Sequence, residues 1–94
     1  MNELRSVRFT IRGQVQGVFY RQHTCAKAGE LGITGWVRNM RDGSVLILAT
    51  GTEEQLNKFS DWCHRGSPRS QVTAVERELI PLSDESDFRV LPTG

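Results

Sequence analysis

The sequence predicts an α+β fold in which two helices cover one face of an antiparallel sheet. Val7, Phe9 and Ile11 alternate with polar residues, which is the pattern of a strand with one buried face. The segment TEEQ at 52–55 is typical of a helix start, and an Asp-Gly pair separates two apolar runs as in a β-hairpin. The chain has 94 residues, and we expect 1–94 to form a single domain.

A helix is expected to follow the first strand, from about Arg21 to Leu31. Cys25, Ala28 and Leu31 are spaced so that they would share one apolar face of this helix. Gly32 stands where a helix often ends in a left-handed cap, because glycine adopts positive φ without steric cost.

The middle of the chain is expected to form two strands joined by a turn. TGWVRNM at 34–40 and SVLILAT at 44–50 are the expected strands, and RDGS between them contains the Asp-Gly pair favoured in tight hairpin turns. Both faces of the later strand are apolar, which is typical of a strand at the centre of a sheet.

The second helix carries the most complete set of local signals. Thr52 and Gln55 are spaced for a capping box, in which each side chain bonds the backbone N–H of the other residue. Leu56, Phe59 and Cys63 then form an apolar stripe at helical spacing, and the segment RGSPRS ends the helix.

Two further strands complete the predicted fold. QVTAVERELI at 71–80 is expected to be the fourth strand, and DFRVL at 87–91 a short edge strand. The order β-α-β-β-α-β with a short extra edge strand fits a ferredoxin-like two-layer α/β sandwich. In that fold the loop after the first strand, the start of the first helix and the end of the second strand lie at one edge of the sheet. Arg21 and Asn39 are therefore expected to come within reach of each other.

Composition excludes several classes of protein. The net charge of +1 argues against a general nucleic-acid binder. The first residues lack the apolar run of a signal peptide, and no segment approaches the roughly 18 apolar residues of a membrane helix. We therefore expect a cytoplasmic protein that binds neither nucleic acid nor membrane, and a monomer is the default expectation.

Charge is unevenly distributed along the chain. Residues 1–41 hold seven Lys or Arg and two Asp or Glu, a net charge of +5, whereas residues 42–94 hold five and nine, a net charge of −4. The positive half contains a glycine-rich segment after the first strand, which suits an anionic ligand.

That segment, GQVQGVFYR at 13–21, has the residues of an anion-binding loop. Gly13 and Gly17 allow a tight turn whose N–H groups face inward, and a following helix start adds unpaired N–H donors. Arg21 adds a planar fork that can bind two oxygens of a phosphate. These local residues are equally compatible with an ordinary glycine turn beside a surface arginine.

The same segment closely resembles the acylphosphatase signature G-x-V-Q-G-V-x-F-R. A second segment, GWVRNMRDGSVLILATG at 35–51, is similar to the other motif of that family, which has a glycine, an aromatic, an asparagine, a Gly-x-Val turn and a closing glycine. The order of the predicted elements agrees with the family over almost the whole chain. One residue departs from the signature, because Tyr20 replaces the usual Phe, and a buried hydroxyl there would need a partner or an opening to water.

The resemblance implies a small metal-independent hydrolase that splits acyl phosphates into a carboxylate and inorganic phosphate, with no cofactor. It implies that Arg21 binds the phosphate and that Asn39 orients the attacking water. It also implies a phosphate cradle built from the backbone amides of Gln16, Gly17, Val18, Phe19 and Tyr20.

Two other functions are possible on the same fold. A non-catalytic phosphate-binding or regulatory domain on the same fold would need Arg21 but has no need of Asn39 to orient water. An RNA-binding module would need aromatics on the open face of the sheet, where the first strand instead places Arg8, Thr10 and Arg12.

Cysteine and histidine chemistry has weak support in the sequence. Cys63 and His64 are adjacent on a helix and diverge by about 100°, so they do not form a nucleophile and base, and His23 and Cys25 fail in the same way. A Cys25–Cys63 disulfide is topologically conceivable but unexpected for cytosolic thiols. A zinc site on these four residues is not expected.

Four larger side chains have a structural and a functional interpretation. We expect Trp36 to pack on the sheet and Trp62 to be a partly buried helix flank rather than ligand-stacking residues. Arg38 and Arg41 could assist an anionic substrate, but such residues are more often solvated hairpin charges.

Overall fold

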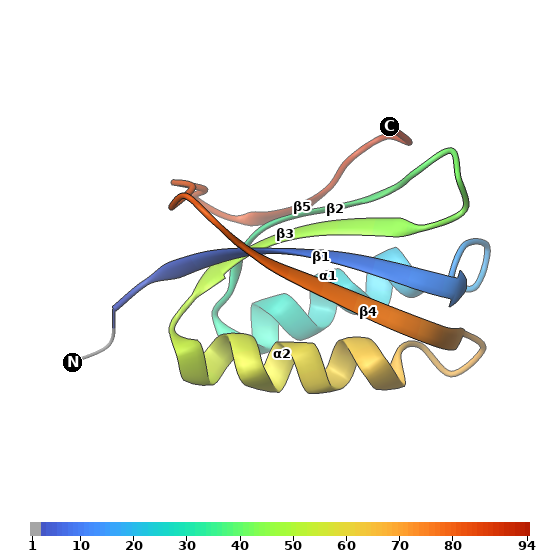
Figure 1. The fold of residues 1–94 in the computed structure, drawn as a ribbon, viewed down its shortest axis with the longest axis horizontal. Helices are drawn as coiled ribbons and strands as arrows, with labels where there is room; N and C mark the ends of the chain where they lie inside the picture. The colour runs from blue at the N-terminus through green and yellow to red at the C-terminus, as the bar shows by residue number, and fades with distance from the viewer. Residues whose placement is uncertain (1–2) are drawn as a thin grey trace.

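The computed structural model describes residues 3–94 and confirms the predicted order of elements (Figure 1). The elements are β1 (Arg5–Gln14), α1 (Tyr20–Leu31), β2 (Thr34–Asn39), β3 (Val45–Gly51), α2 (Glu53–Arg65), β4 (Gln71–Ile80) and β5 (Phe88–Val90). The strands form one sheet in the order β4-β1-β3-β2-β5, and both helices cover the same face of it. No helix among these residues is long and apolar enough to cross a membrane.

The sheet is mixed rather than wholly antiparallel. The strands β1, β2, β3 and β4 pair antiparallel, as expected, whereas the short edge strand β5 pairs parallel to β2, with Gly35 opposite Phe88. The central position of β3 explains its two apolar faces. The alternation in β1 is confirmed as well, because Val7, Phe9 and Ile11 all point into the core under the helices.

The buried face of α1 differs from the predicted one. Tyr20, Thr24 and Ala28 are buried, while Cys25 and Leu31 are only partly covered. Thr24 tolerates burial because its hydroxyl donates to the carbonyl of Tyr20 at 2.7 Å, so no polar atom is left without a partner. The predicted glycine cap is confirmed: the residue after Leu31 has φ 74° and ψ 26°, in the left-handed region.

The predicted capping box of α2 is present. Gln55 N–H donates to the Thr52 hydroxyl at 3.2 Å, and Thr52 N–H donates to the Gln55 side chain at 2.7 Å. The predicted stripe is buried, but the expectation for Trp62 is wrong, because it is only 8% exposed. Its ring packs against Tyr20 with 5.3 Å between ring centroids, and against Phe59 in the core.

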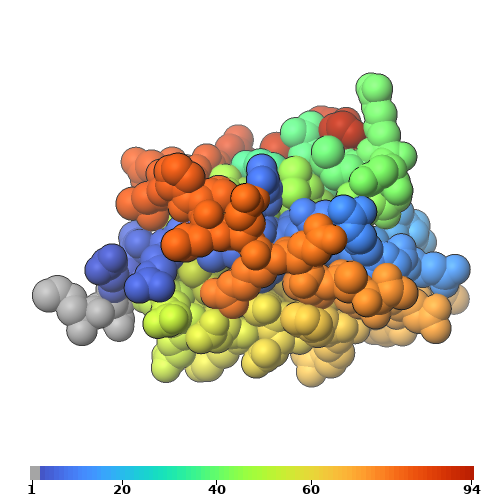
Figure 2. Space-filling view, in the orientation of Figure 1, coloured from blue at the N-terminus to red at the C-terminus, as the bar shows by residue number. Residues whose placement is uncertain are grey.

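The connection between β2 and β3 is a loop over 40–44 rather than a two-residue turn. Met40 N–H donates to the Ser44 carbonyl at 2.8 Å, and Asp42 accepts from the Ser44 N–H at 3.0 Å and from its hydroxyl at 2.6 Å. Gly43 has φ 94°, which explains the glycine of the Asp-Gly pair. Figure 2 shows this hairpin standing out at the upper right, close to the loop between β1 and α1.

Two glycines give a matched test of this packing. A Cβ at Gly35, where φ is 140°, would lie 1.8 Å from the Leu48 carbonyl oxygen, whereas a Cβ at Gly29 in α1 would meet nothing within 4 Å. We expect Gly35→Ala to lower the free energy of unfolding by about 3 kcal/mol or more. Gly29→Ala should raise it by about 0.5–1 kcal/mol through helix propensity. Urea unfolding of both variants measures these changes. Equal stability of the two variants would contradict the close approach of Gly35 to the Leu48 carbonyl.

Candidate functional site

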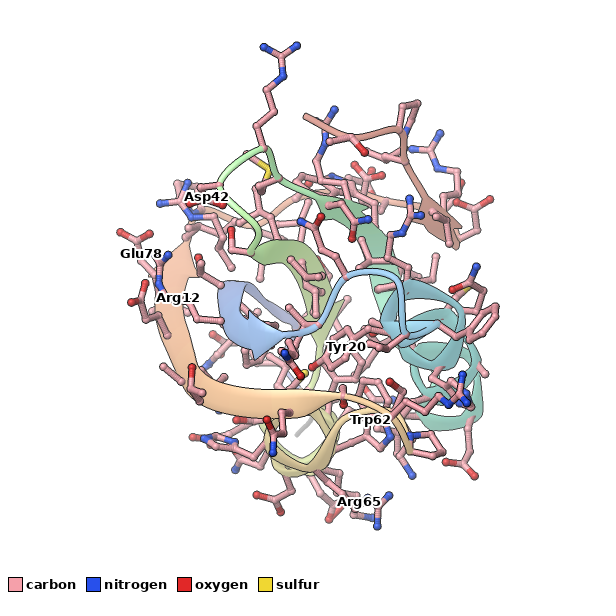
Figure 3. All side chains as sticks on the ribbon, turned by 90° about the vertical axis from the view of Figure 1, so that its right-hand side faces the viewer. Arg12, Tyr20, Asp42, Trp62, Arg65 and Glu78 are labelled. Carbon is pink, nitrogen blue, oxygen red and sulfur yellow. The ribbon has the colours of Figure 1, made fainter. Side chains whose placement is uncertain are left out.

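The predicted convergence at one edge of the sheet is present in the structure. The loop between β1 and α1, the first turn of α1 and the end of β2 enclose a pocket of about 150 Å³. Its lining residues are Val15, Gly17, Phe19, Tyr20, Arg21, Gln22 and Asn39. Arg21 and Asn39 therefore line the same small pocket, and Figure 3 views the molecule from this edge.

The loop between β1 and α1 leaves its N–H groups unpaired. Gly17 has φ 75°, and Phe19 has φ 61° and ψ 23°, the one positive φ at a non-glycine residue among 3–94. Phe19 is the N-cap of α1 and makes no side-chain capping bond. Within the described part of the chain, the N–H groups of 16–20 donate to no protein acceptor. The loop and helix start thus form a concave set of free donors, as an anion-binding nest requires.

Arg21 differs in its partners from Arg12, another arginine near this edge. Arg12 on β1 is paired with Glu76 at 3.1 Å and with Asp42 at 3.7 Å. Across residues 3–94, no carboxylate lies within ion-pair distance of Arg21. Its guanidinium is therefore free to bind an anion in the pocket with its fork of donors.

Asn39 lines the pocket and carries an unsatisfied polar atom. Its Oδ1 is buried, and it has no hydrogen-bond partner among the described residues. A buried carbonyl oxygen without a partner costs free energy, so such an atom normally binds water or a ligand. The side-chain amide of Asn39 is thus suited to holding a water molecule beside the donors of the loop.

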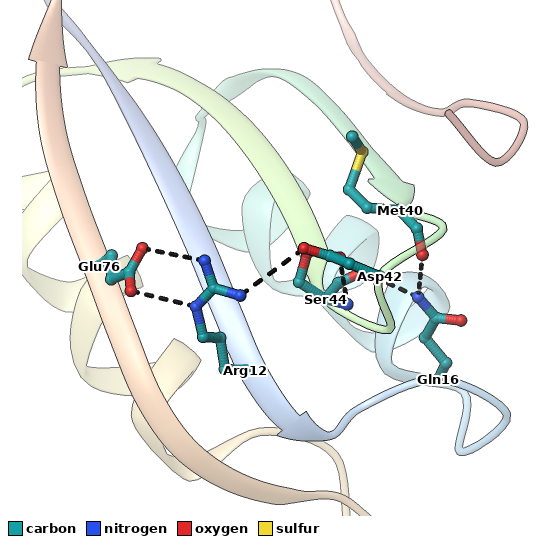
Figure 4. A network of polar contacts seen from close by, with 6 residues as sticks. All are labelled: Arg12, Gln16, Met40, Asp42, Ser44 and Glu76. Carbon is teal, nitrogen blue, oxygen red and sulfur yellow. Dashed lines mark hydrogen bonds and ion pairs between the residues drawn. The ribbon is translucent and has the colours of Figure 1, made fainter.

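A glutamine joins the two loops that form the site. Gln16 Nε2 donates to the Met40 carbonyl at 2.7 Å and to the Ser44 carbonyl at 2.8 Å, which ties the loop after β1 to the loop over 40–44 (Figure 4). Sequence reasoning assigned only the backbone amide of Gln16 to the site and missed this side-chain role. The two acceptors are backbone carbonyls, so no residue type in the hairpin signals the contact.

The hairpin loop is held from its other side by a charged cluster. Asp42 bonds Ser44 and lies beside Arg12, which also contacts Glu76 of β4 (Figure 4). The hydrogen bonds from Ser44, with a smaller contribution from the Arg12 charge, lower the pKa of Asp42 below its ordinary value. Asp42 therefore stays ionised and keeps accepting from Ser44 at neutral pH.

The buried hydroxyl of Tyr20 makes a hydrogen bond. The ring is 1% exposed, and the hydroxyl donates to the Cys63 carbonyl at 2.9 Å. This bond links the first residue of α1 to the end of α2. The structure therefore accommodates Tyr20 in place of the usual Phe without an opening to water.

The cysteines do not form a reactive or bridged pair. Both are free; Cys63 is buried, and Cys25 is partly exposed with its thiol 3.6 Å from the Phe88 carbonyl. Burial raises the pKa of the Cys63 thiol to about 12, which disfavours a thiolate at neutral pH. His64 is exposed and donates from Nδ1 to the Ser60 carbonyl. No cluster of His, Cys, Asp and Glu able to hold a metal is found between residues 3 and 94.

The sequence matches one protein family along most of its length. A family model described as acylphosphatase matches residues 7–90. An acylphosphatase of Marinobacter nauticus is 49% identical over 80 residues, which are 84% of this chain and 87% of the relative. An acylphosphatase of Methylococcus capsulatus is 42% identical over 89 residues, covering 94% of this chain and 97% of the relative.

Solved structures agree with the sequence comparison. The structure of an acylphosphatase from Coxiella burnetii superposes with a TM-score of 0.92 at 39% identity, covering 96% of this chain and 94% of the other. The acylphosphatase from Bacillus subtilis gives a TM-score of 0.90 at 34% identity, covering 95% of this chain and 99% of the other. The predicted ferredoxin-like fold is confirmed by these neighbours.

The buried hydroxyl and thiol beside the site predict a loss of stability at high pH. Burial raises the pKa of Tyr20 above its ordinary value of 10.0, and that of Cys63 from 9.0 to about 12. Both groups stay protonated in the folded protein but ionise when it unfolds. Their stabilising contribution is therefore complete below about pH 9 and is lost as the pH rises further, by about 1.4 kcal/mol per pH unit for each group.

Urea unfolding between about pH 8 and pH 11 measures this slope. Tyr20→Phe should cost about 1 kcal/mol at pH 8, because the Cys63 carbonyl loses its donor. Above about pH 10 the free energy of unfolding of this variant should fall less steeply than that of wild type, because the variant has no tyrosine hydroxyl to ionise. If the free energy of unfolding declined equally steeply with pH in wild type and Tyr20→Phe, the raised pKa of Tyr20 would be contradicted.

Proposed function

Since the chain belongs to the acylphosphatase family and is an enzyme that hydrolyses acyl phosphates, we propose a mechanism for the reaction at this site. Arg21 and the backbone amides of 16–20 hold the phosphate, and Asn39 orients the water that attacks it. The observation that carries the proposal is that one pocket is lined by the loop before α1, by Arg21 and by Asn39, and that each of these has polar groups without a partner.

Each unpaired group matches a requirement of phosphoryl transfer. The loop N–H groups and the start of α1 supply partial positive charge around the phosphate oxygens. Arg21 binds two of these oxygens and stabilises the charge that develops on them in the transition state. These donors are fixed by the backbone before the substrate binds, so little reorganisation is needed during the reaction.

Asn39 supplies orientation and no proton transfer. In this proposal its Oδ1 accepts a hydrogen bond from the attacking water. The role is supported because Asn39 lines the pocket and its Oδ1 has no other partner among the described residues. An amide is not a base at neutral pH, so we propose that a phosphate oxygen of the substrate accepts the proton. The leaving group is a carboxylate, which departs without protonation, so the mechanism needs no general acid.

The neighbouring arginines have a smaller part in this proposal. Arg38 Nε donates to the Pro92 carbonyl at 3.1 Å, and its guanidinium lies over the Trp36 ring, 5.9 Å from the ring centroid. Arg41 is an exposed residue of the hairpin loop. The enzymatic character of the relatives argues against the alternative of a non-catalytic phosphate-binding domain.

The proposed roles are separable by mutation. Hydrolysis of benzoyl phosphate in excess EDTA is measured for wild type and for variants whose folding has been confirmed by circular dichroism. Asn39→Ala should lower kcat by on the order of 10²–10³, by analogy with the loss of one transition-state hydrogen bond in other enzymes. Arg21→Ala should be nearly inactive, and Arg21→Lys should remain far below wild type because it loses the planar fork.

Arg41→Ala is the matched control, since it removes an arginine near the same edge. Its kcat should change by less than about twofold, as expected for a solvated charge.

Inorganic phosphate should raise the Tm of wild type and Asn39→Ala but not that of Arg21→Ala. Turnover by wild type that requires added metal would contradict the metal-independent mechanism. Full activity of Asn39→Ala would show that Asn39 does not orient the attacking water.

The absence of a protein base in the mechanism predicts a specific pH dependence. Because the proton goes to the substrate, kcat should stay flat from about pH 8 to about pH 5, below the usual histidine pKa of about 6.5. Initial rates at saturating benzoyl phosphate test this. A fall in kcat centred near pH 6.5 would indicate that a histidine acts as the base.

A further inference from the structure

The last residues of the chain lie against the strand that carries Asn39. The family match ends at residue 90, so 91–94 lies beyond it. Leu91 N–H donates to the Val37 carbonyl at 2.8 Å, and Gly94 N–H donates to the Asn39 carbonyl at 2.9 Å. Figure 1 shows this segment following β2 from β5 toward the hairpin.

These bonds continue the sheet past the end of β5. The paired residues of β5 end at Val90, opposite Val37, and on that side β2 would otherwise have no neighbour at Asn39. On its other side Asn39 is paired with Val45 of β3. Asn39 is therefore held from both sides only because Gly94 reaches it.

The segment is itself anchored to β2 and to the hairpin. Arg38 Nε donates to the Pro92 carbonyl, and Arg41 N–H donates to the Gly94 carbonyl at 3.3 Å. Gly94 thus bonds one residue of β2 and one residue of the hairpin, on either side of Met40. Met40 is also one of the residues whose carbonyl accepts from Gln16 of the loop after β1.

From these contacts we propose that 91–94 is a positioning element for the hydrolytic water, with Gly94 as the residue that fixes Asn39. The Gly94 N–H holds the Asn39 carbonyl and so fixes the end of β2, the backbone that carries the Asn39 side chain. The inference rests on the proposed function, in which Asn39 orients water. A small misplacement of an orienting group lowers the rate without a matching loss of binding.

Two substitutions at Gly94 separate the hydrogen bond from the added bulk. A Cβ at this position would lie 2.6 Å from the Arg38 guanidinium carbon, so Ala and Pro both displace the same flexible side-chain end. Only Pro also removes the N–H, and its ring carbon takes the place of the hydrogen that faces the Asn39 carbonyl, so it cannot keep this contact. We expect kcat for benzoyl phosphate to be about three- to tenfold lower in Gly94→Pro than in Gly94→Ala, as for the loss of one hydrogen bond.

Two further readouts distinguish positioning from a general structural effect. The inhibition constant of inorganic phosphate should be the same in both variants, because the loop and Arg21 are untouched. In an Asn39→Ala background the kcat difference between Gly94→Pro and Gly94→Ala should vanish, since there is no amide left to orient.

Equal kcat in the two variants overturns the inference. A difference that persists without the Asn39 side chain, or one accompanied by weaker phosphate inhibition, overturns it as well. If Asn39→Ala alone retains full activity, the proposed function fails. If Asn39→Ala is slow but Gly94→Pro and Gly94→Ala have the same kcat, the positioning role of 91–94 is refuted and the proposed function stands.

Discussion

The site depends on one contact between two loops that are distant in sequence. Gln16 Nε2 donates to the carbonyls of Met40 and Ser44, and this pair of bonds fixes the loop after β1 against the hairpin after β2. The loop carries the unpaired backbone donors and the hairpin follows Asn39, so the contact fixes these two parts of the pocket relative to each other. These partly buried hydrogen bonds are directional, and losing them would detach the loop after β1 from the hairpin, although each carbonyl would keep one backbone donor.

The loop also needs an anchor at its far end, because its own N–H groups are unpaired. Phe19 adopts a left-handed conformation that costs a non-glycine residue of the order of 1 kcal/mol. The next residue offsets this cost: Tyr20 buries its ring against Trp62 and bonds the Cys63 carbonyl. A rigid start of α1 thus maintains a strained loop whose free donors an anion can satisfy.

Local signals in the sequence were sufficient for most of the fold. The alternation in β1 and the capping box at Thr52 depend on neighbouring residues, and both were predicted correctly. The meeting of Arg21 and Asn39 followed from strand directions alone. The buried face of α1 was missed because Thr24 is polar and is satisfied by its own helix. The Gln16 contact was missed because its acceptors are backbone carbonyls, which every residue carries.

The size of the pocket bears on which substrates the enzyme accepts. Its volume of about 150 Å³ is small, so in the proposed mechanism a phosphate group occupies it and a long acyl group extends toward solvent. In the proposed mechanism the contacts come from backbone donors and Arg21 to the phosphate, so the acyl group contributes little binding energy. Binding energy spent on the transferred group acts in the transition state of every acyl phosphate alike. The same geometry that makes the site small therefore favours broad acceptance of acyl groups.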